Sequence, residues 1–290
     1  MEDYIISATA ADGTIRAISA ATTNIVREAA TIHGLSAVAS AALGRTLTAA
    51  VMMSKSLKGD KDTLTIQIRG GGPLGGIVVV SDSKANVRGY VHNPDVASYL
   101  NSSGKLDVSG AVGKDGYINV IKDLGLKEPY IGYVNLISGE IAEDIAYYFY
   151  SSEQIPSVVS LGVLVDSDGS IICSGGFIIQ LMPGAGEDIA AELEDRANSV
   201  PPVTKLLSEG KSPEHILETV LNGMNLKIAG KSQCRYLCNC SRDRMEANLI
   251  SLGKKEILDI AGEQHGAELQ CHFCNKKYWF SEKELIDLAE

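Results

Sequence analysis

Two close pairs of cysteines near the carboxyl end constrain the fold of this chain more than any other feature. Cys238 and Cys240 form a CxC pair, thirty residues follow, and Cys271 and Cys274 form a CxxC pair. Four thiolates brought together are a tetrahedral donor set that suits zinc. In an extended segment, residues i and i+2 share a face, so both sulfurs of the CxC pair can reach one ion. The spacing predicts a four-cysteine zinc site in a small C-terminal domain.

Two interpretations of this site use the same ligands, and the spacing alone does not choose between them. In the first, zinc only stabilises a small domain that would otherwise lack a sufficient core. In the second, the thiolates form a redox switch, because oxidants attack thiolates and loss of the metal removes the free energy that folds the domain. An oxidation signal would then become an unfolding signal.

Three residues outside this set of four leave further alternatives. Cys234 lies four residues before Cys238, and we expect a bystander because the two pairs already complete a tetrahedron. An alternative ligand and a resolving cysteine are the other interpretations of Cys234. Cys173 is predicted to be a small buried hydrophobic residue. His272 could replace a sulfur ligand, but four sulfurs are available without it.

Composition limits the remaining function classes. The chain has 290 residues, 45% of them hydrophobic, and a net charge of -10, so it can form about two globular domains and is a poor counterion for nucleic acid. It lacks an uninterrupted apolar run of about 18 residues and opens without a secretory signal. Five of its six cysteines lie after residue 233, which favours metal binding or redox chemistry over a disulfide framework. We therefore expect a cytoplasmic protein.

Residues 1–182 are predicted to form a mixed α and β core domain. Hairpins are expected around Asp12-Gly13 and Asp168-Gly169, because Asp-Gly tolerates the positive φ of a tight turn. Two packed helices are expected between residues 24 and 57 with a break near Gly34, and another helix from Glu140 to Tyr150. Many strands with few helices between them predict an α+β fold. The other expected strands are Thr63–Arg69, Ile77–Asp82, Val87–Val91, Tyr117–Lys122 and Gly132–Ile137.

Residues 183–231 are predicted to be a helical linker, which leaves residues 232–290 as the zinc domain. Residues 1–180 and residues 181–290 each hold 18 acidic and 13 basic side chains, so charge is denser in the shorter second part. A charged amphipathic helix is expected from Glu187 to Asn198, before Pro201-Pro202. Ser212 is a predicted N-cap with Pro213 at the first helical position. We expect this segment to depend on its neighbours for stability.

Several other motifs are weak or absent. Residues 70–75 match GxGxxG, but a strand rather than a helix follows, so we expect a glycine-rich strand connection. GxxxxGK[ST], HExxH and GxSxG do not occur, which gives no support for ATP-driven work or catalysis. Asp166 and Asp168 are interpreted as turn residues, and Trp279, with Tyr278 and Phe280, is expected to pack the metal domain. The scattered histidines are interpreted as surface or satisfied side chains: His33, His92, His215 and His265.

Over essentially its whole length, the chain resembles the bacterial redox-regulated chaperones of the 33-kilodalton heat shock protein family. The cysteine pattern carries the resemblance, with Cys238-Asn239-Cys240-Ser241 followed by Arg242 and Arg244. Two stretches in the first part of the chain support it. One is residues 69–75 (RGGGPLG), and the other is residues 139–148 (GEIAEDIAYY), which is followed by SEQIP at residues 152–156. Cys234 lies outside the four-cysteine pattern of the family.

The resemblance implies an ATP-independent holdase chaperone rather than an enzyme. It implies that Cys238, Cys240, Cys271 and Cys274 bind one zinc ion per chain in a reduced, inactive form. Oxidation would form the disulfides Cys238–Cys240 and Cys271–Cys274, release zinc, and unfold the C-terminal domain and the linker. The activated protein, a homodimer, would bind unfolding clients through a client-binding and dimerisation surface assigned to residues 1–182. The implied partners include no ATP, nucleic acid or membrane.

The residues themselves agree with this implication. A linker broken by prolines is followed by a metal domain too small to fold alone, so both should loosen together when the metal is lost. The absence of a nucleotide motif fits a binder driven by redox state. Loosening would expose apolar side chains of the linker: Leu206, Ile216, Val220 and Leu221.

Two other functions compete with the chaperone. A zinc-ribbon nucleic-acid binder would use the basic pairs Lys254-Lys255 and Lys276-Lys277, but both parts of the chain are net acidic by five charges (18 minus 13). A thiol–disulfide oxidoreductase would need its CxxC to open a helix after a strand, where the helix dipole lowers the thiol pKa. The residues after Cys274 look extended instead, and the second cysteine pair would have no role.

Overall fold

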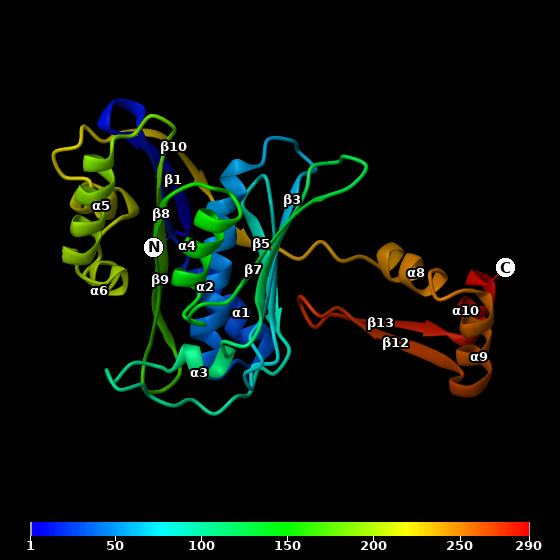
Figure 1. Cartoon of the computed structure of the whole chain (residues 1–290). Helices are drawn as coiled ribbons and strands as arrows, with labels where there is room; N and C mark the ends of the chain where they lie inside the picture. Colours follow the sequence, from blue (N-terminus) through cyan, green and yellow to red (C-terminus); the bar gives the residue numbers. More distant parts are fainter. Residues whose placement is uncertain (1, 290) are drawn as a thin grey trace. The chain divides into compact units, whose positions relative to one another are not determined.

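The structure is a computed structural model that describes residues 2–289 and forms two compact units, residues 1–237 and 238–290. The first unit holds a five-stranded and a six-stranded sheet, and the second holds a two-stranded sheet (Figure 1). The expected α+β class is confirmed.

The five-stranded sheet has the order β10-β1-β2-β9-β8, and each neighbouring pair is antiparallel. The hairpin expected at Asp12-Gly13 joins β1 to β2 through the short 3-10 turn η1 (Ala11–Gly13). Asp166 and Asp168 are turn residues, as expected: their carboxylates accept hydrogen bonds from the backbone N–H groups of Ser167 and Ser170. The strands are β1 (Tyr4–Ala10), β2 (Ile15–Ala21), β8 (Ser157–Val165), β9 (Ile171–Leu181) and β10 (Lys227–Gln233).

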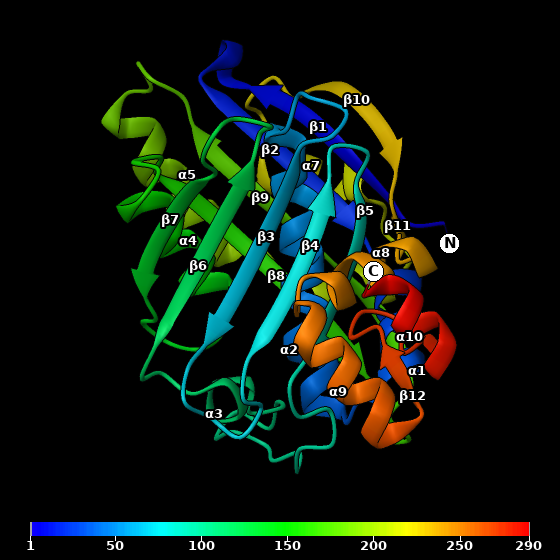
Figure 2. The ribbon, with the colours of Figure 1, turned by 90° about the vertical axis from the view of Figure 1, so that its right-hand side faces the viewer.

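The six-stranded sheet has the order β11-β5-β4-β3-β6-β7 (Figure 2). Alternation in β3 buries Leu64, Ile66 and Ile68 completely, as its period of two predicts. β7 begins and ends two residues earlier than the predicted strand, so the predicted range of 132–137 was wrong at both ends. The strands are β3 (Thr63–Arg69), β4 (Ile77–Asp82), β5 (Asn86–Val91), β6 (Tyr117–Asp123), β7 (Tyr130–Asn135) and β11 (Arg235–Tyr236), which is parallel to β5.

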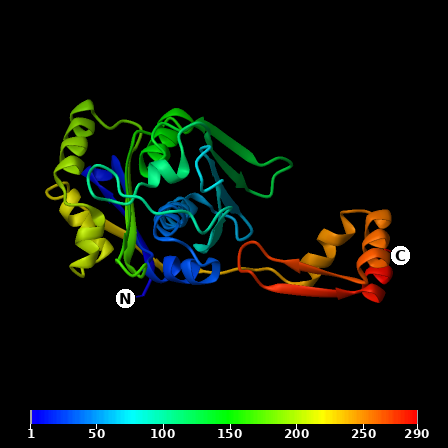
Figure 3. The same ribbon diagram turned by 90° about the horizontal axis from the view of Figure 1, so that it is seen from below.

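Helix α2 (Ala37–Met53) forms the core between the two sheets, where it contacts β4 and β5 on one side and β8 and β9 on the other (Figure 3). The expected break between helices is real: α1 (Thr23–His33) ends at Gly34, which is left-handed with φ 60°. The stretch Ala37–Ser56 (α2 with the 3-10 turn η2, Ser54–Ser56) is long and apolar enough to cross a membrane, but 89% of its apolar 18-residue window is buried in the protein. The remaining helices are α3 (Val108–Val112) and α4 (Ala142–Ser151), which was expected from Glu140 to Tyr150.

The segment predicted as a linker folds against the outer face of the five-stranded sheet (Figure 1). It contains α5 (Glu187–Ser199), α6 (Val203–Ser208) and α7 (Pro213–Val220), and Ser212 caps α7 as predicted by accepting from the His215 N–H. The division of the chain at residues 183 and 232 stays a prediction. The helices contribute a row of buried apolar side chains to a core shared with β1, β2 and β9: Leu193, Val203, Leu206, Leu207, Ile216, Leu217, Val220 and Leu221.

The glycine-rich stretch at residues 70–75 connects β3 to β4, as its sequence indicates. It runs close to the carboxyl end of α3, because a Cβ on Gly72 would lie 2.5 Å from the carbonyl oxygen of Ala111. No side chain fits there unless the backbone moves. These glycines allow the connection to approach the end of α3 closely.

The second unit is a small layer of three helices and one hairpin. In β13, Tyr278 and Phe280 are buried while Trp279 is 58% exposed, so the expectation that Trp279 packs the metal domain was wrong. Strand alternation explains the difference, because residue 279 faces away from its two neighbours. The elements are α8 (Arg242–Ile250), α9 (Lys254–Gln264), β12 (Gly266–Gln270), β13 (Lys277–Ser281) and α10 (Glu282–Leu288).

Candidate metal centre

The four cysteines predicted as ligands lie together in the second unit. All four Sγ atoms lie within 4.8 Å of one another. The Cys238 and Cys271 sulfurs are 3.6 Å apart, and the Cys240 and Cys274 sulfurs are 3.4 Å apart. Four sulfurs around a zinc ion at about 2.3 Å would be separated by about 3.8 Å, the edge of the tetrahedron. The donor set and its spacing therefore fit a tetrahedral thiophilic metal ion.

Local structure holds each cysteine pair in place. The CxC pair lies in the extended segment before α8, where Ser241 caps the helix by accepting from the Arg244 N–H, and the Arg244 guanidinium donates to the Asn239 side chain. The CxxC pair lies in the turn between β12 and β13. In that turn the carbonyl of Cys271 accepts from the N–H groups of Cys274 and Asn275. The CxxC therefore lies between two strands and does not open a helix, which disfavours the oxidoreductase alternative.

One residue of the centre was missed at the sequence level. The Tyr278 Oη lies 3.2 Å from the Cys240 Sγ, and the tyrosine is 7% exposed. From the sequence, Tyr278 was expected only to pack the metal domain. Its position in β13, on the same face as Phe280, was the available signal, because the face turned toward the small core is also the face next to the sulfurs.

The surroundings of the cysteines shift the pKa values of their thiols in different directions. Burial, together with hydrogen bonds among the cysteines, raises the pKa of Cys238. Burial also raises the pKa of Cys274. Burial acts in the same direction on Cys240, but hydrogen bonds from Tyr278 and from the neighbouring thiols outweigh it and lower its pKa to about 7. Cys240 is thus the thiol with the strongest local support for a negative charge.

The other two cysteines belong to the first unit and not to this group. Cys234 is 5% exposed in the core between the two sheets, and burial raises its pKa to about 12. Cys173 is also buried, as predicted, with its thiol 3.4 Å from the Thr204 carbonyl oxygen. His272 is exposed and is not part of the four-residue cluster.

Comparisons of this chain with known proteins all match one protein family. A family model described as Hsp33 protein matches residues 3–281. Among curated relatives, a 33 kDa chaperonin of Acetivibrio thermocellus is 60% identical over 100% of this chain and 98% of its own, and one of Ruminiclostridium cellulolyticum is 61% identical over 100% and 99%. The crystal structure of the 33 kDa chaperonin from Thermotoga maritima matches with a TM-score of 0.90 at 38% identity, covering 100% of this chain and 98% of that one.

Proposed function

The chain belongs to the Hsp33 family of chaperones, and from that premise we propose that it is a redox-regulated, ATP-independent holdase. The observation that carries the proposal is the cluster of four sulfur atoms within 4.8 Å in a small C-terminal unit. The same cluster supports the choice of Cys238, Cys240, Cys271 and Cys274 as ligands of one zinc ion per chain. Bound zinc would keep the four sulfurs as thiolates and supply free energy for folding.

The unit around the sulfurs depends on such a ligand. Its core consists of a few apolar side chains, among them Met245, Leu249, Phe280 and Leu285, and the cysteines themselves line it. A core of this size seldom stabilises a fold without a metal or a disulfide. Loss of the thiolate–metal bonds should therefore unfold the unit.

Oxidation would act on the cysteine pairs in a balanced reaction. Cys238 and Cys240 form one disulfide and Cys271 and Cys274 form the other, so four thiolates lose four electrons. Two molecules of hydrogen peroxide accept these electrons and, with four protons, leave as four waters, while the Zn²⁺ ion departs without changing its charge. Attack is expected to begin at a thiolate.

The helices α5, α6 and α7 supply the surface that this change would release. They bury Leu206, Ile216, Val220 and Leu221, none of them more than 6% exposed, against β1, β2 and β9. We propose that the helices of residues 183–231 leave this sheet once residues 232–290 unfold. Both the helices and the uncovered sheet would then offer apolar surface to unfolding client proteins and to a second copy of the chain in an activated homodimer.

The remaining features of the proposal follow from the family and the sequence. The relatives are named chaperonins, so we assign no catalysis to the chain. We further propose that it works in the cytoplasm, where thiolates are kept reduced until oxidative stress, without ATP, nucleic acid or a membrane as partners.

Zinc content, free thiols and aggregation suppression can be measured together before and after peroxide. We expect one zinc per reduced chain, loss of four thiols with the zinc, and suppression of aggregation of a denatured client only afterwards. Cys238→Ser should prevent full zinc retention, whereas Cys173→Ser is a matched control because that thiol lies outside the cluster. A reduced wild-type protein without metal, or an oxidised zinc-free protein that leaves client aggregation unchanged, would refute the proposal.

A further inference from the structure

A groove of about 690 Å³ lies in the first unit. Its walls come from α2, from β8 and from the first turn of α6. Buried apolar side chains line each wall: Ala41 on α2, Val163 on β8 and Val203 on α6. A cavity of this size, largely apolar, falls within the usual range for a small-molecule site.

Three cationic side chains from separate parts of the chain also line this groove: Arg45, Lys105 and Lys205. Within the described residues 2–289, neither Lys105 nor Lys205 has a carboxylate partner for its ammonium group. Asp166 is the single carboxylate among the lining residues, and it accepts hydrogen bonds from Ser167. The groove therefore has a net positive lining in a protein whose net charge is -10.

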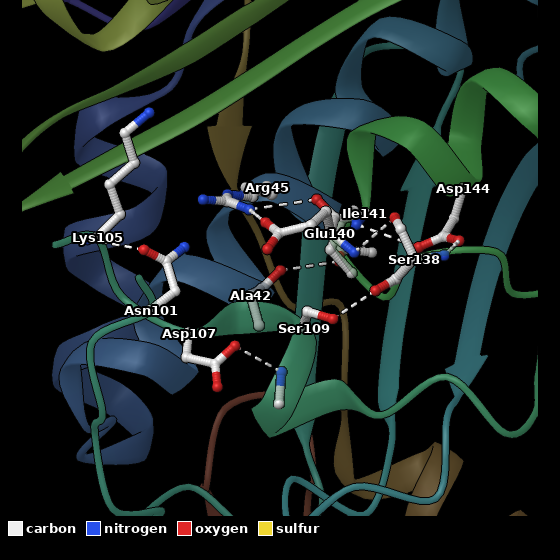
Figure 4. Close-up of polar contacts among 12 residues, drawn as sticks. Ala42, Arg45, Asn101, Lys105, Asp107, Ser109, Ser138, Glu140, Ile141 and Asp144 are labelled. Atoms are coloured by element: carbon white, nitrogen blue, oxygen red, sulfur yellow. Dashed lines mark hydrogen bonds and ion pairs between the residues drawn. The ribbon is translucent and has the colours of Figure 1, made fainter. Parts of the chain in front are cut away.

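Arg45 is held in a fixed position at the groove. Its Nη1 donates to the Glu140 carboxylate at 2.8 Å and to the Glu140 carbonyl oxygen at 3.2 Å. Its Nε is buried without a hydrogen-bond partner among the described residues. Figure 4 shows the Arg45 guanidinium bonded to Glu140 on one side, and Lys105, which lines the same groove, lies beyond its other side in this view.

The turn that carries Glu140, the partner of Arg45, is itself strained. Ile141 has φ 66° although it is β-branched and fully buried. The Asp144 carboxylate holds this turn by accepting from the N–H groups of Ile137, Ser138 and Ile141 (Figure 4). Strained backbone of this kind persists only where surrounding contacts determine it, so the Glu140 carbonyl oxygen is a fixed acceptor for Arg45.

We propose that this groove binds an anionic amphiphile, a carboxylate on a medium-length aliphatic chain. The carboxylate would lie among Arg45, Lys105 and Lys205, and the aliphatic chain would lie on the apolar walls beside Val163 and Val203. Charge complementarity selects the anionic head, because the two lysines lack an acidic partner of their own. The apolar walls select the tail, because a purely polar anion would leave them in contact with water.

The position of α6 gives the ligand a second effect, which rests on the function proposed above. Because Val203 and Lys205 belong to α6, the groove is complete only while α6 lies on the sheet. A ligand that binds only this state stabilises it by the factor 1 + [L]/Kd. The bound amphiphile would therefore hold α6 in place and oppose release of the linker.

Binding is tested on the reduced, zinc-loaded full chain by titration calorimetry, with decanoate below its micelle concentration as the probe. Decanol, which has the tail without the charge, and inorganic phosphate, which has charge without the tail, are the comparison probes. We expect decanoate to bind at least about tenfold more tightly than either. If decanol bound as tightly as decanoate, the cations would not contribute to binding. If phosphate bound as tightly, the apolar walls would not contribute. Either result, or no binding of decanoate at all, would overturn the proposal.

The variant Lys105→Gln/Lys205→Gln locates the site without disturbing Arg45, because both lysines are exposed. We expect it to weaken decanoate binding by about tenfold, whereas the exposed Lys127→Gln is a matched control and should have no effect. At ten times Kd, decanoate should slow hydrogen exchange of the α6 amides about elevenfold. Unchanged affinity in the double variant, or unchanged or faster α6 exchange, would contradict the proposal. These measurements need neither oxidant nor client, so they can fail while oxidation still activates the chaperone.

Discussion

The substitution Ile216→Ala on α7 should favour release of α6 and α7 from the five-stranded sheet. Ile216 is fully buried where α7 contacts β1, β2 and β9. Truncation of a fully buried isoleucine costs about 2–5 kcal/mol, through lost burial and the cavity that remains. If α6 and α7 leave the sheet as a unit, the whole cost falls on the docked state. The ratio of released to docked chains should then rise by about 30-fold to several thousand-fold.

The assay is hydrogen exchange of the reduced, zinc-loaded variant, resolved by segment. We expect faster exchange in α6 and α7, unchanged exchange in β3 and β4, and partial suppression of client aggregation without any oxidant. Glu218→Ala, on the exposed side of the same helix, is the matched control and should change little. Loss of protection in β1, β2 and β9 together with α7 would show that the segment does not separate from the sheet and would refute the reasoning.

Three further predictions test individual contacts. The hydrogen bonds that Tyr4 and Lys231 donate to Glu214 outweigh its burial and lower the pKa of its carboxyl group to about 2. The contribution of Glu214 to α7 docking is therefore present above pH about 4.5 and is lost as the pH falls through 2. Glu214→Gln should remove that dependence and cost on the order of 1 kcal/mol, measured by exchange against pH; an unchanged pH profile would contradict it. Tyr278→Phe removes the hydroxyl next to Cys240 and should weaken zinc binding about tenfold in chelator competition, and equal affinity would exclude this role. Gly72→Ala should destabilise the first unit by about 1–3 kcal/mol in denaturant unfolding, whereas Gly186→Ala, which meets open space, should not.

Several strands of the first unit were predictable because their buried and less buried residues alternate strictly. The bounds of β3 and β4 agree with the predicted ranges, since each has one face in the core. The position of β7 was wrong because this edge strand exposes Tyr130 and Ile131, so its pattern does not distinguish an inner from an outer face. Pairings far apart in sequence, such as β10 with β1 and β11 with β5, carry no local signal at all.

The ligand cluster was predictable for a different reason. Four cysteines in two close pairs have few alternative uses, so their spacing alone indicated one site. The neighbours of that site were harder to predict, because Tyr278 and Trp279 are adjacent aromatic residues and only strand alternation separates their roles. The groove beside Arg45 could not be predicted, because its cations come from α2, from the chain before α3 and from α6.

We propose that sulfur-bound zinc keeps the linker, residues 183–231, folded. The most direct test is hydrogen exchange of residues 183–231 in the wild-type chain while peroxide removes zinc stepwise, with zinc occupancy measured on the same samples. The account predicts that protection of α5, α6 and α7 falls in proportion to the zinc released, while β3 and β4 remain protected. Protection of these helices that persists after the zinc has left would contradict it.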